Sequence, residues 1–158
     1  MIRDLSLELV TYGRGTRWNK NLFIPIVNNW VKPGGGLWCS PVDSNYGWKD
    51  WCRSENWGLD SLQEKFKVDY TGHTLIIDSF EDMKDMICRK DPYGTIGIYC
   101  SQYPDFESIL ASGIDAIYLT EKGEERTRFT TPNLYGWDCE CVLVMNPDSI
   151  RDNYIKGE

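Results

Sequence analysis

Three separated stretches of the chain carry residues that can do chemistry, and together they supply the parts of a ligand site. The first stretch, "TYGRG", offers a backbone edge beside Gly13. The second, "GGLWCSP", carries the Trp38 indole and the Ser40 hydroxyl, and the third, "YGWDCE", carries Trp137 and the Glu140 carboxylate. Glycines let a backbone edge approach a ligand closely, and aromatic rings wall it off from water. If the three stretches meet in space, we expect them to admit a ligand and enclose it.

The spacing of apolar residues predicts the elements that must position these stretches. Leu5, Leu7 and Leu9 alternate with their neighbours, which is typical of a half-buried strand, whereas Trp48, Trp51 and Cys52 recur at helical spacing. We expect strands over 5–13, 35–42, 64–70, 73–79, 114–120 and 137–146, with a short strand or extended piece over 96–100. Helices are expected over 47–57, 80–90 and 103–113. The polar segment 121–136 is expected to be a loop, which is long for a compact domain and is therefore mobile or functional.

This order of elements predicts the fold class. Strands come first, short helices lie between them, and strands come last, which favours an α+β fold with a mostly antiparallel, split sheet over a doubly wound parallel one. The chain has 158 residues and shows no repeat and no linker. We therefore expect residues 1–158 to form a single domain.

Composition narrows the classes of function. The formal charge of −7 argues against a protein whose main role is to grip a phosphate backbone. No run of 18 apolar residues and no export signal are visible, so we expect a cytoplasmic protein with no membrane partner and with its six cysteines reduced. One histidine, His73, and scattered cysteines predict no metal site. Motifs for dinucleotide folds (GxGxxG), phosphate loops (GxxxxGK[ST]) and serine hydrolases (GxSxG) are missing too.

The order and content of the three stretches resemble the ADP-ribosyltransferase family. The resemblance runs through "VTYG", then "GGLWCSP", then "SGIDAIYLTEKG" with "DCECVLVMNPDSI", which is similar to the closing hairpin of those enzymes. It covers three short motifs and the approximate order of elements. It implies an ADP-ribosyltransferase-like fold and an NAD-dependent transfer of ADP-ribose to a macromolecule, with release of nicotinamide. NAD would be the substrate, and the acidic composition favours protein over nucleic acid as the acceptor.

The resemblance also implies roles for individual residues. Glu140 would be the catalytic acid, because a carboxylate stabilises the oxocarbenium-like centre that forms when the nicotinamide–ribose bond breaks. The residues implied to bind NAD are Tyr12, Gly13, Arg14, Arg17, Trp38 and Ser40, with Trp137 as a further wall. Trp48 and Trp51 are expected to pack their helix onto the sheet.

Two departures from the family pattern leave alternatives open. Tyr12 stands where the family has His or Arg, unless Arg14 or Arg17 reaches in from the loop. Glu140 lies six residues before Asn146, where the usual motif has five, and one residue of offset reverses the face of a strand to which a side chain points. A bulge near Cys139 would restore the register. Otherwise Glu121 is the fallback acid, and Asp138 competes with Glu140.

Other functions remain open at this point. An NAD-hydrolysing enzyme on the same fold would use a small acceptor. A non-catalytic, acidic, tryptophan-rich interaction protein, such as a viral or mobile-element inhibitor of a host protein, would present its indoles to a partner. A further alternative for Ser40 is that its hydroxyl only forms a hydrogen bond with its own backbone in the turn before Pro41. Tyr12 is also open to a purely structural role.

Overall fold

Two long strands, β1 (Ile2–Tyr12) and β3 (Lys65–Ile77), form the frame of the sheet. They pair antiparallel along the full length of β1, from Ile2 opposite Leu75 to Tyr12 opposite Lys65. The other strands are β2 (Leu37–Pro41), β4 (Cys88–Lys90), β5 (Gln102–Pro104), β6 (Ala116–Leu119), β7 (Cys141–Val144) and β8 (Ile150–Asp152). The computed structural model describes residues 1–90, 102–130 and 132–153. The expected extended piece over 96–100 lies outside them.

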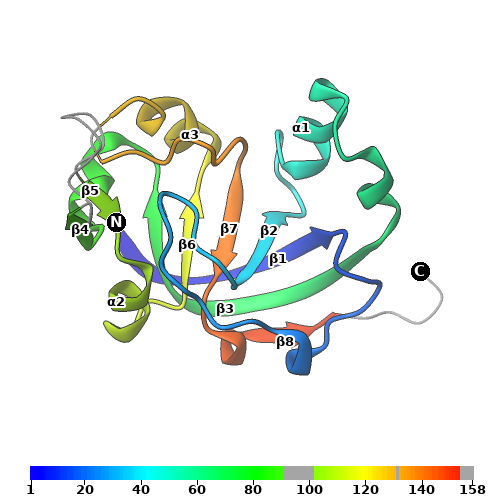
Figure 1. The fold of residues 1–158 in the computed structure, drawn as a ribbon. Helices are drawn as coiled ribbons and strands as arrows, with labels where there is room; N and C mark the ends of the chain where they lie inside the picture. Colours follow the sequence, from blue (N-terminus) through cyan, green and yellow to red (C-terminus); the bar gives the residue numbers. More distant parts are fainter. Residues whose placement is uncertain (91–101, 131, 154–158) are drawn as a thin grey trace.

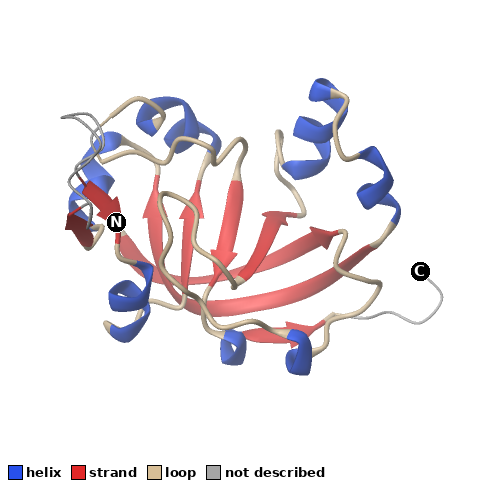
Figure 2. Cartoon of the chain, viewed as in Figure 1, coloured by secondary structure: helices blue, strands red, loops and turns tan. Residues whose placement is uncertain are grey.

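The helical segments are short and lie around the ends of the strands (Figure 2). Among the described residues, three are α-helices: α1 (Trp48–Glu55), α2 (Phe106–Ala111) and α3 (Glu121–Thr127). The same part of the chain has four 3₁₀ helices: Lys20–Leu22, Leu59–Gln63, Phe80–Asp85 and Pro147–Ser149. Figure 1 shows α1 and α3 at the same end of the sheet, on opposite sides of β2 and β7.

The sheet is mostly antiparallel, as the sequence predicts, and it closes on itself. The strand order is β1-β2-β7-β6-β3-β8, and β1 pairs with β3 as well as β2, so five strands form a closed barrel. Only the pairing of β3 with β6 is parallel among these described strands. The expected split is therefore replaced by closure, through the contacts of Leu9 and Val10 with Pro41 and Ser40. Because those contacts are two residue pairs between sequence-distant strands, the local pattern gives no sign of them.

The predicted strands 64–70 and 73–79 are one continuous strand, β3. The expected break between them, at residues 71–72, is absent, because Gly72 lies within the ladder opposite Leu5. A Cβ at this position would stand 2.7 Å from the Tyr70 hydroxyl oxygen and 2.8 Å from an Asp115 carboxylate oxygen. Gly72 is thus required by close side-chain packing, which the sequence alone does not distinguish from a turn.

Several other boundaries differ from the expected ones. The polar segment 121–136 begins with α3, whose first turn is capped by the Thr120 hydroxyl, which accepts a hydrogen bond from the Gly123 backbone nitrogen at 3.0 Å. The expected helix over 80–90 ends at Asp85 and is followed by β4. The last strand starts at Cys141 instead of 137, so Trp137 to Glu140 lie outside the sheet ladder.

The end of β3 and the whole of β7 are buried on both faces. Leu75, Ile76 and Ile77 are all at most 4% exposed, which confirms that the continuous apolar run of β3 is covered on both sides. Alternate residues of β7 belong to two different apolar clusters, with Leu143 in one and Val142 and Val144 in the other. No helix among the described residues is long and apolar enough to cross a membrane.

Candidate functional site

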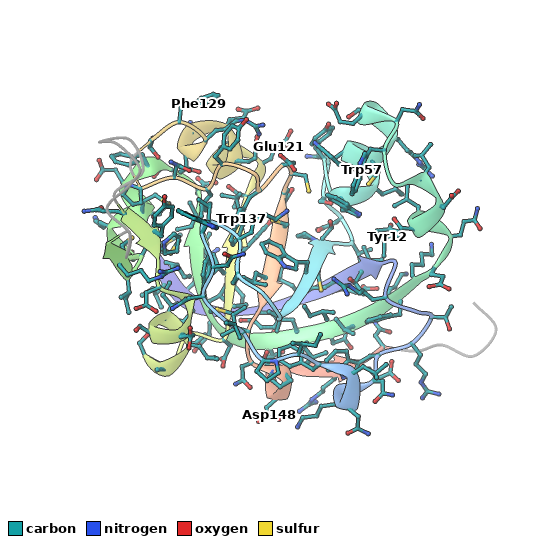
Figure 3. The ribbon with its side chains drawn as sticks, viewed as in Figure 1. Tyr12, Trp57, Glu121, Phe129, Trp137 and Asp148 are labelled. Atoms are coloured by element: carbon teal, nitrogen blue, oxygen red, sulfur yellow. The ribbon has the colours of Figure 1, made fainter. Side chains whose placement is uncertain are left out.

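A pocket of about 420 Å³ lies between the end of β1, β2, α1 and the segment that leads into β7. It brings together all three stretches that the sequence analysis selected. Of the residues expected to bind a ligand, the wall includes Tyr12, Gly13, Arg14, Trp38 and Ser40, with Trp137 beside them. Figure 3 shows Tyr12 and Trp57 on the α1 side of the molecule, with Trp137 nearer its middle. We call this the Trp38 pocket.

Gly13 turns the chain sharply at the end of β1. Its φ angle is +73°, and a Cβ there would stand 3.0 Å from the Cβ of Ser61, so a larger residue would be both strained and crowded. Its backbone nitrogen donates to the Glu64 carbonyl oxygen at 2.9 Å. This turn leaves Tyr12 and Arg14 on either side of the glycine at the pocket wall. Burial, followed by the Asp50 carboxylate, raises the pKa of Tyr12, so its hydroxyl is neutral.

β2 supplies the central wall of the pocket. The Trp38 ring meets the Trp137 ring edge to face at a centroid distance of 4.7 Å, and the Lys32 ammonium lies 5.5 Å from the Trp38 ring centre. The Thr11 hydroxyl donates to the Trp38 carbonyl oxygen at 2.7 Å, which fixes β2 against β1. Trp38 is therefore fixed by its neighbours and contributes an aromatic surface to the pocket wall.

Ser40 lies at the pocket wall and also caps a helix. Its side-chain oxygen accepts a hydrogen bond from the Trp48 backbone nitrogen at 2.9 Å, and the residue is only 3% exposed. The oxygen thus satisfies a free N–H at the start of α1 from outside the helix. This is neither of the roles that the sequence indicates, although the hydroxyl proton remains available to donate.

Replacing Ser40 with Ala is expected to destabilise the protein by about 1 kcal/mol, because the Trp48 N–H loses its acceptor at a buried helix start. The measurement is the free energy of unfolding from urea titration. Ser6→Ala, at an exposed site on β1, is the matched control and should change stability by less than about 0.5 kcal/mol. Equal stabilities of the Ser40 and Ser6 variants would contradict this role.

α1 and the residues after it form an indole wall. The rings of Trp48 and Trp51 are stacked with centroids 5.0 Å apart, and Trp57 meets both of them edge on. Trp48 and Trp57 line the Trp38 pocket, whereas Trp51 does not. Trp48 and Trp51 both pack against the main apolar cluster, as expected, and Trp48 lines the pocket as well. Trp57 is a wall residue that the sequence prediction does not include, although its place in a tryptophan-rich segment is a visible signal.

The opposite wall comes from the segment before β7. Trp137, Asp138 and Cys139 line the pocket, together with the buried thiols of Cys39 and Cys141. Burial raises the pKa of Cys139 to about 12 and also raises the pKa values of Cys39 and Cys141. These thiols are neutral at physiological pH, so they form a polarisable apolar floor and supply no thiolate nucleophile. The five cysteines in the part of the chain that the structure describes are free.

Glu140, the expected catalytic acid, does not line this pocket. Its carboxylate accepts a hydrogen bond of 2.5 Å from the Tyr118 hydroxyl, and its backbone nitrogen donates to the Tyr46 carbonyl oxygen at 3.1 Å. Burial raises the pKa of Glu140, the Tyr118 hydrogen bond opposes that rise, and the nearby Glu121 and Asp43 carboxylates add to it. The register offset seen in the sequence is thus not restored.

Two other expected residues also lie outside the Trp38 pocket. The fallback acid Glu121 is exposed at the first turn of α3 and is not a wall residue. Arg17 pairs with Asp152 at 2.9 Å and lines a neighbouring pocket of about 460 Å³. The chain leaves β1 at Gly13 in a direction that carries Arg17 towards β8.

The neighbouring pocket shares two lining residues, Arg14 and Trp38, with the Trp38 pocket. Its wall is otherwise largely apolar, with Trp18, Phe23 and Phe66 among its residues, and it includes the three glycines 34–36. We call it the Phe66 pocket. Because the two pockets share Arg14 and Trp38 in their walls, we refer to them together as the two-lobed site.

The charge of this two-lobed site is opposite in sign to that of the whole chain. Its charged wall residues are three basic ones, Arg14, Arg17 and Lys32, and one acidic one, Asp138, and Arg17 is already paired with Asp152 outside the wall. Arg14 makes no ion pair with any other described residue. In a protein of charge −7, this local excess of positive charge favours an anionic ligand.

No cluster of three or more His, Cys, Asp or Glu side chains with metal-binding geometry occurs among residues 1–90, 102–130 and 132–153. Comparison of the chain with protein-family models, with curated proteins and with solved structures gave no match.

Proposed function

We propose that this protein binds NAD in the two-lobed site and transfers its ADP-ribose group to a macromolecule, releasing nicotinamide. The observation that carries the proposal is the convergence of the β1 end, β2 and the segment before β7 on the Trp38 pocket. These are the stretches on which the resemblance to ADP-ribosyltransferases rests. The finer assignment of an ADP-ribosyltransferase-like fold belongs to the same proposal.

The chemistry of the Trp38 pocket suits the nicotinamide end of the ligand. The oxidised pyridine ring is flat and positively charged, and such a ring is attracted to the faces of indoles. Trp38, Trp48 and Trp57 supply these faces, and Asp138 supplies the single carboxylate of the wall. Gly13 keeps the backbone edge next to the pocket free of a side chain, so that a ring amide can approach it.

The remaining parts of NAD match the rest of the site. A dinucleotide has two ring-bearing halves joined by a pyrophosphate, and the site has two neighbouring pockets that share Arg14 in their walls. A guanidinium pairs well with phosphate oxygens because its N–H groups form a fork. The aromatic and aliphatic wall of the Phe66 pocket suits an adenine ring. Each cavity falls within the size range of about 300–1,000 Å³ that is usual for small-molecule sites.

The class of acceptor is inferred from the charge of the chain. The net charge of −7 favours a protein acceptor over a nucleic acid, because a polyanion would be repelled from most of the surface. Water in place of the macromolecule would make the same site an NAD hydrolase. Cytoplasmic NAD would meet the substrate requirement in either case.

Arg14→Ala is expected to weaken NAD binding by about 10-fold or more, because it removes a charge-assisted contact with the pyrophosphate. The measurement is quenching of tryptophan fluorescence during titration, since four tryptophans line the Trp38 pocket. Free nicotinamide, which has no phosphate, should bind the wild type and the variant equally. Arg126→Ala, which removes an exposed arginine of α3 outside both pockets, is the matched control.

Two outcomes of this titration would overturn the proposal. A wild-type protein whose fluorescence is unchanged by millimolar NAD does not bind it at a useful affinity. Binding that Arg14→Ala and Arg126→Ala weaken equally would place the nucleotide elsewhere on the surface.

A second candidate function is favoured by a different observation. Trp57, Phe129 and Tyr135 are 58%, 85% and 56% exposed, and aromatic side chains of this kind anchor protein–protein interfaces. A non-catalytic interaction protein, for example one from a virus or mobile element, would use them without any nucleotide. Such a protein would ignore NAD in the same titration.

A further inference from the structure

The carboxylate that lines the Trp38 pocket is not the one that the family pattern indicates. Among the described residues that line this pocket, Asp138 is the single acid. Its side chain is 23% exposed, so it is accessible from the pocket yet largely shielded from bulk water. A carboxylate in such a place interacts more strongly with a nearby positive charge than one in open solvent does.

The backbone before β7 explains why Asp138 and Glu140 differ. Strand alternation would place both side chains on one face, but β7 begins only at Cys141, and residues 136–140 are irregular. Trp137, Asp138 and Cys139 are consecutive and all line the pocket. Glu140 then turns away to the Tyr118 hydroxyl.

Arg128 lies behind Asp138. One guanidinium nitrogen is 3.8 Å from an Asp138 carboxylate oxygen, and the other donates to Glu124 at 2.7 Å. The Tyr135 ring lies 5.0 Å from the centre of the same guanidinium. Arg128 thus has three neighbours and makes a long ion pair with Asp138, without a hydrogen bond between the two side chains among the described contacts.

Glu140 has the contacts of a structural residue. Its hydrogen bond to Tyr118 joins the start of β7 to β6, and its backbone bond to Tyr46 joins the same point to the loop that precedes α1. The side chain therefore fixes the position of the segment that carries Asp138. Neither contact requires a negative charge on residue 140, because a neutral amide oxygen also accepts a hydrogen bond.

We propose, on the basis of the NAD-consuming function proposed above, that Asp138 is the catalytic carboxylate of this site and that Glu140 is structural. In the reaction, the bond between ribose C1′ and the pyridine nitrogen breaks, and its electron pair leaves with neutral nicotinamide. Positive charge develops at C1′ and the ribose ring oxygen, facing Asp138. The acceptor oxygen or nitrogen then bonds to C1′, and its proton passes to Asp138 and on to solvent. With water as acceptor, the products are nicotinamide, ADP-ribose and one proton.

The test compares Asp138→Asn with Glu140→Gln, which change the two carboxylates to amides in the same way. Nicotinamide release from NAD is measured by chromatography, with and without a cell lysate as a source of acceptor. We expect Asp138→Asn to lower kcat by at least about 100-fold while the affinity for NAD changes less than about threefold. Asp138→Glu should restore part of the rate. Glu140→Gln should keep kcat within about threefold of the wild type.

The other outcomes separate this proposal from the one on which it rests. If Glu140→Gln loses turnover and Asp138→Asn keeps it, the assignment of the acid is wrong while NAD consumption stands. If the wild type binds no NAD and releases no nicotinamide, both proposals are wrong. Circular dichroism and urea midpoints of each variant show whether a loss of turnover comes from unfolding. An Asp138→Glu protein that is folded and binds NAD, but turns over no faster than Asp138→Asn, would also count against the assignment.

Discussion

Trp137→Ala is expected to destabilise the protein by about 3–5 kcal/mol, which is a large part of the stability of a domain of this size. Trp137 is only 1% exposed. Its ring stacks with Phe106 at a centroid distance of 6.3 Å and meets Trp38 edge on, and its indole nitrogen donates to the Val31 carbonyl oxygen at 2.9 Å. Truncation would leave a cavity of indole size and an unsatisfied carbonyl group at once.

Two further variants, compared by urea unfolding, separate the contribution of the buried ring from that of its hydrogen bond to Val31. Trp137→Phe keeps most of the ring and removes the hydrogen bond to Val31, so it should cost about 1–3 kcal/mol. Trp57→Ala removes an indole that is 58% exposed and should cost less than about 1.5 kcal/mol. A Trp137→Ala protein as stable as Trp57→Ala would mean that the site wall does not depend on Trp137.

Gly35→Ala is expected to be the second most damaging change, with a loss of at least about 3 kcal/mol. The φ angle of Gly35 is +72°, and a Cβ there would stand 2.1 Å from the Pro25 carbonyl oxygen, which belongs to the backbone and cannot rotate away. The segments around Ile24 and Gly36 are tied together by the hydrogen bond from the Gly36 nitrogen to the Ile24 carbonyl oxygen, at 2.8 Å. Alanine would force them apart and distort the Phe66 pocket.

Gly15→Ala is the matched control for this prediction. Gly15 has a φ angle of +90°, so alanine is strained there too, but a Cβ would meet no atom within 4 Å. Its expected cost is about 1–2 kcal/mol, from the backbone conformation alone. The difference between the two variants measures the crowding at Gly35. Unfolding energies of the two that agree within about 1 kcal/mol would contradict the close contact with Pro25.

The strands of the barrel are largely visible in the sequence, whereas its closure is not. Alternation of Leu5, Leu7 and Leu9 reflects one buried face and predicts β1, and the continuous apolar run of β3 predicts burial on both faces. The paired register of β1 with β2 is short, with Leu9 opposite Pro41 and Val10 opposite Ser40. Such a pairing depends on the three-dimensional course of a long connection, about which local periodicity carries no information.

The candidate site is likewise predictable from the sequence only in part. Residue type and motif order were enough to select Tyr12, Gly13, Arg14, Trp38 and Ser40, which the structure brings to one pocket. The resemblance selects Glu140, but the acid that lines the pocket is Asp138, because this depends on where β7 starts. If the strand began at Trp137, Asp138 and Glu140 would share a face; because it begins at Cys141, they separate. Strand boundaries are set by pairing partners, which a single sequence does not contain.

The tryptophans of α1 and the segment after it show a third limit of prediction from the sequence. The helical spacing of Trp48 and Trp51 indicates that they share a helix face, and the structure confirms that they stack together. Which of them also faces a cavity depends on how α1 sits against β2, and that is set by the Ser40 cap at Trp48. The sequence shows the serine and the helix, but not that one caps the other.

The most direct test of the central claim is a crystal structure of the protein with an NAD analogue whose glycosidic bond cannot be cleaved. We expect the pyridine ring in the Trp38 pocket with its ribose C1′ facing Asp138, the pyrophosphate on Arg14 and the adenine in the Phe66 pocket. Saturating analogue that binds away from Arg14 and Trp38, or that leaves both pockets without ligand density, would contradict the claim that this is an NAD site.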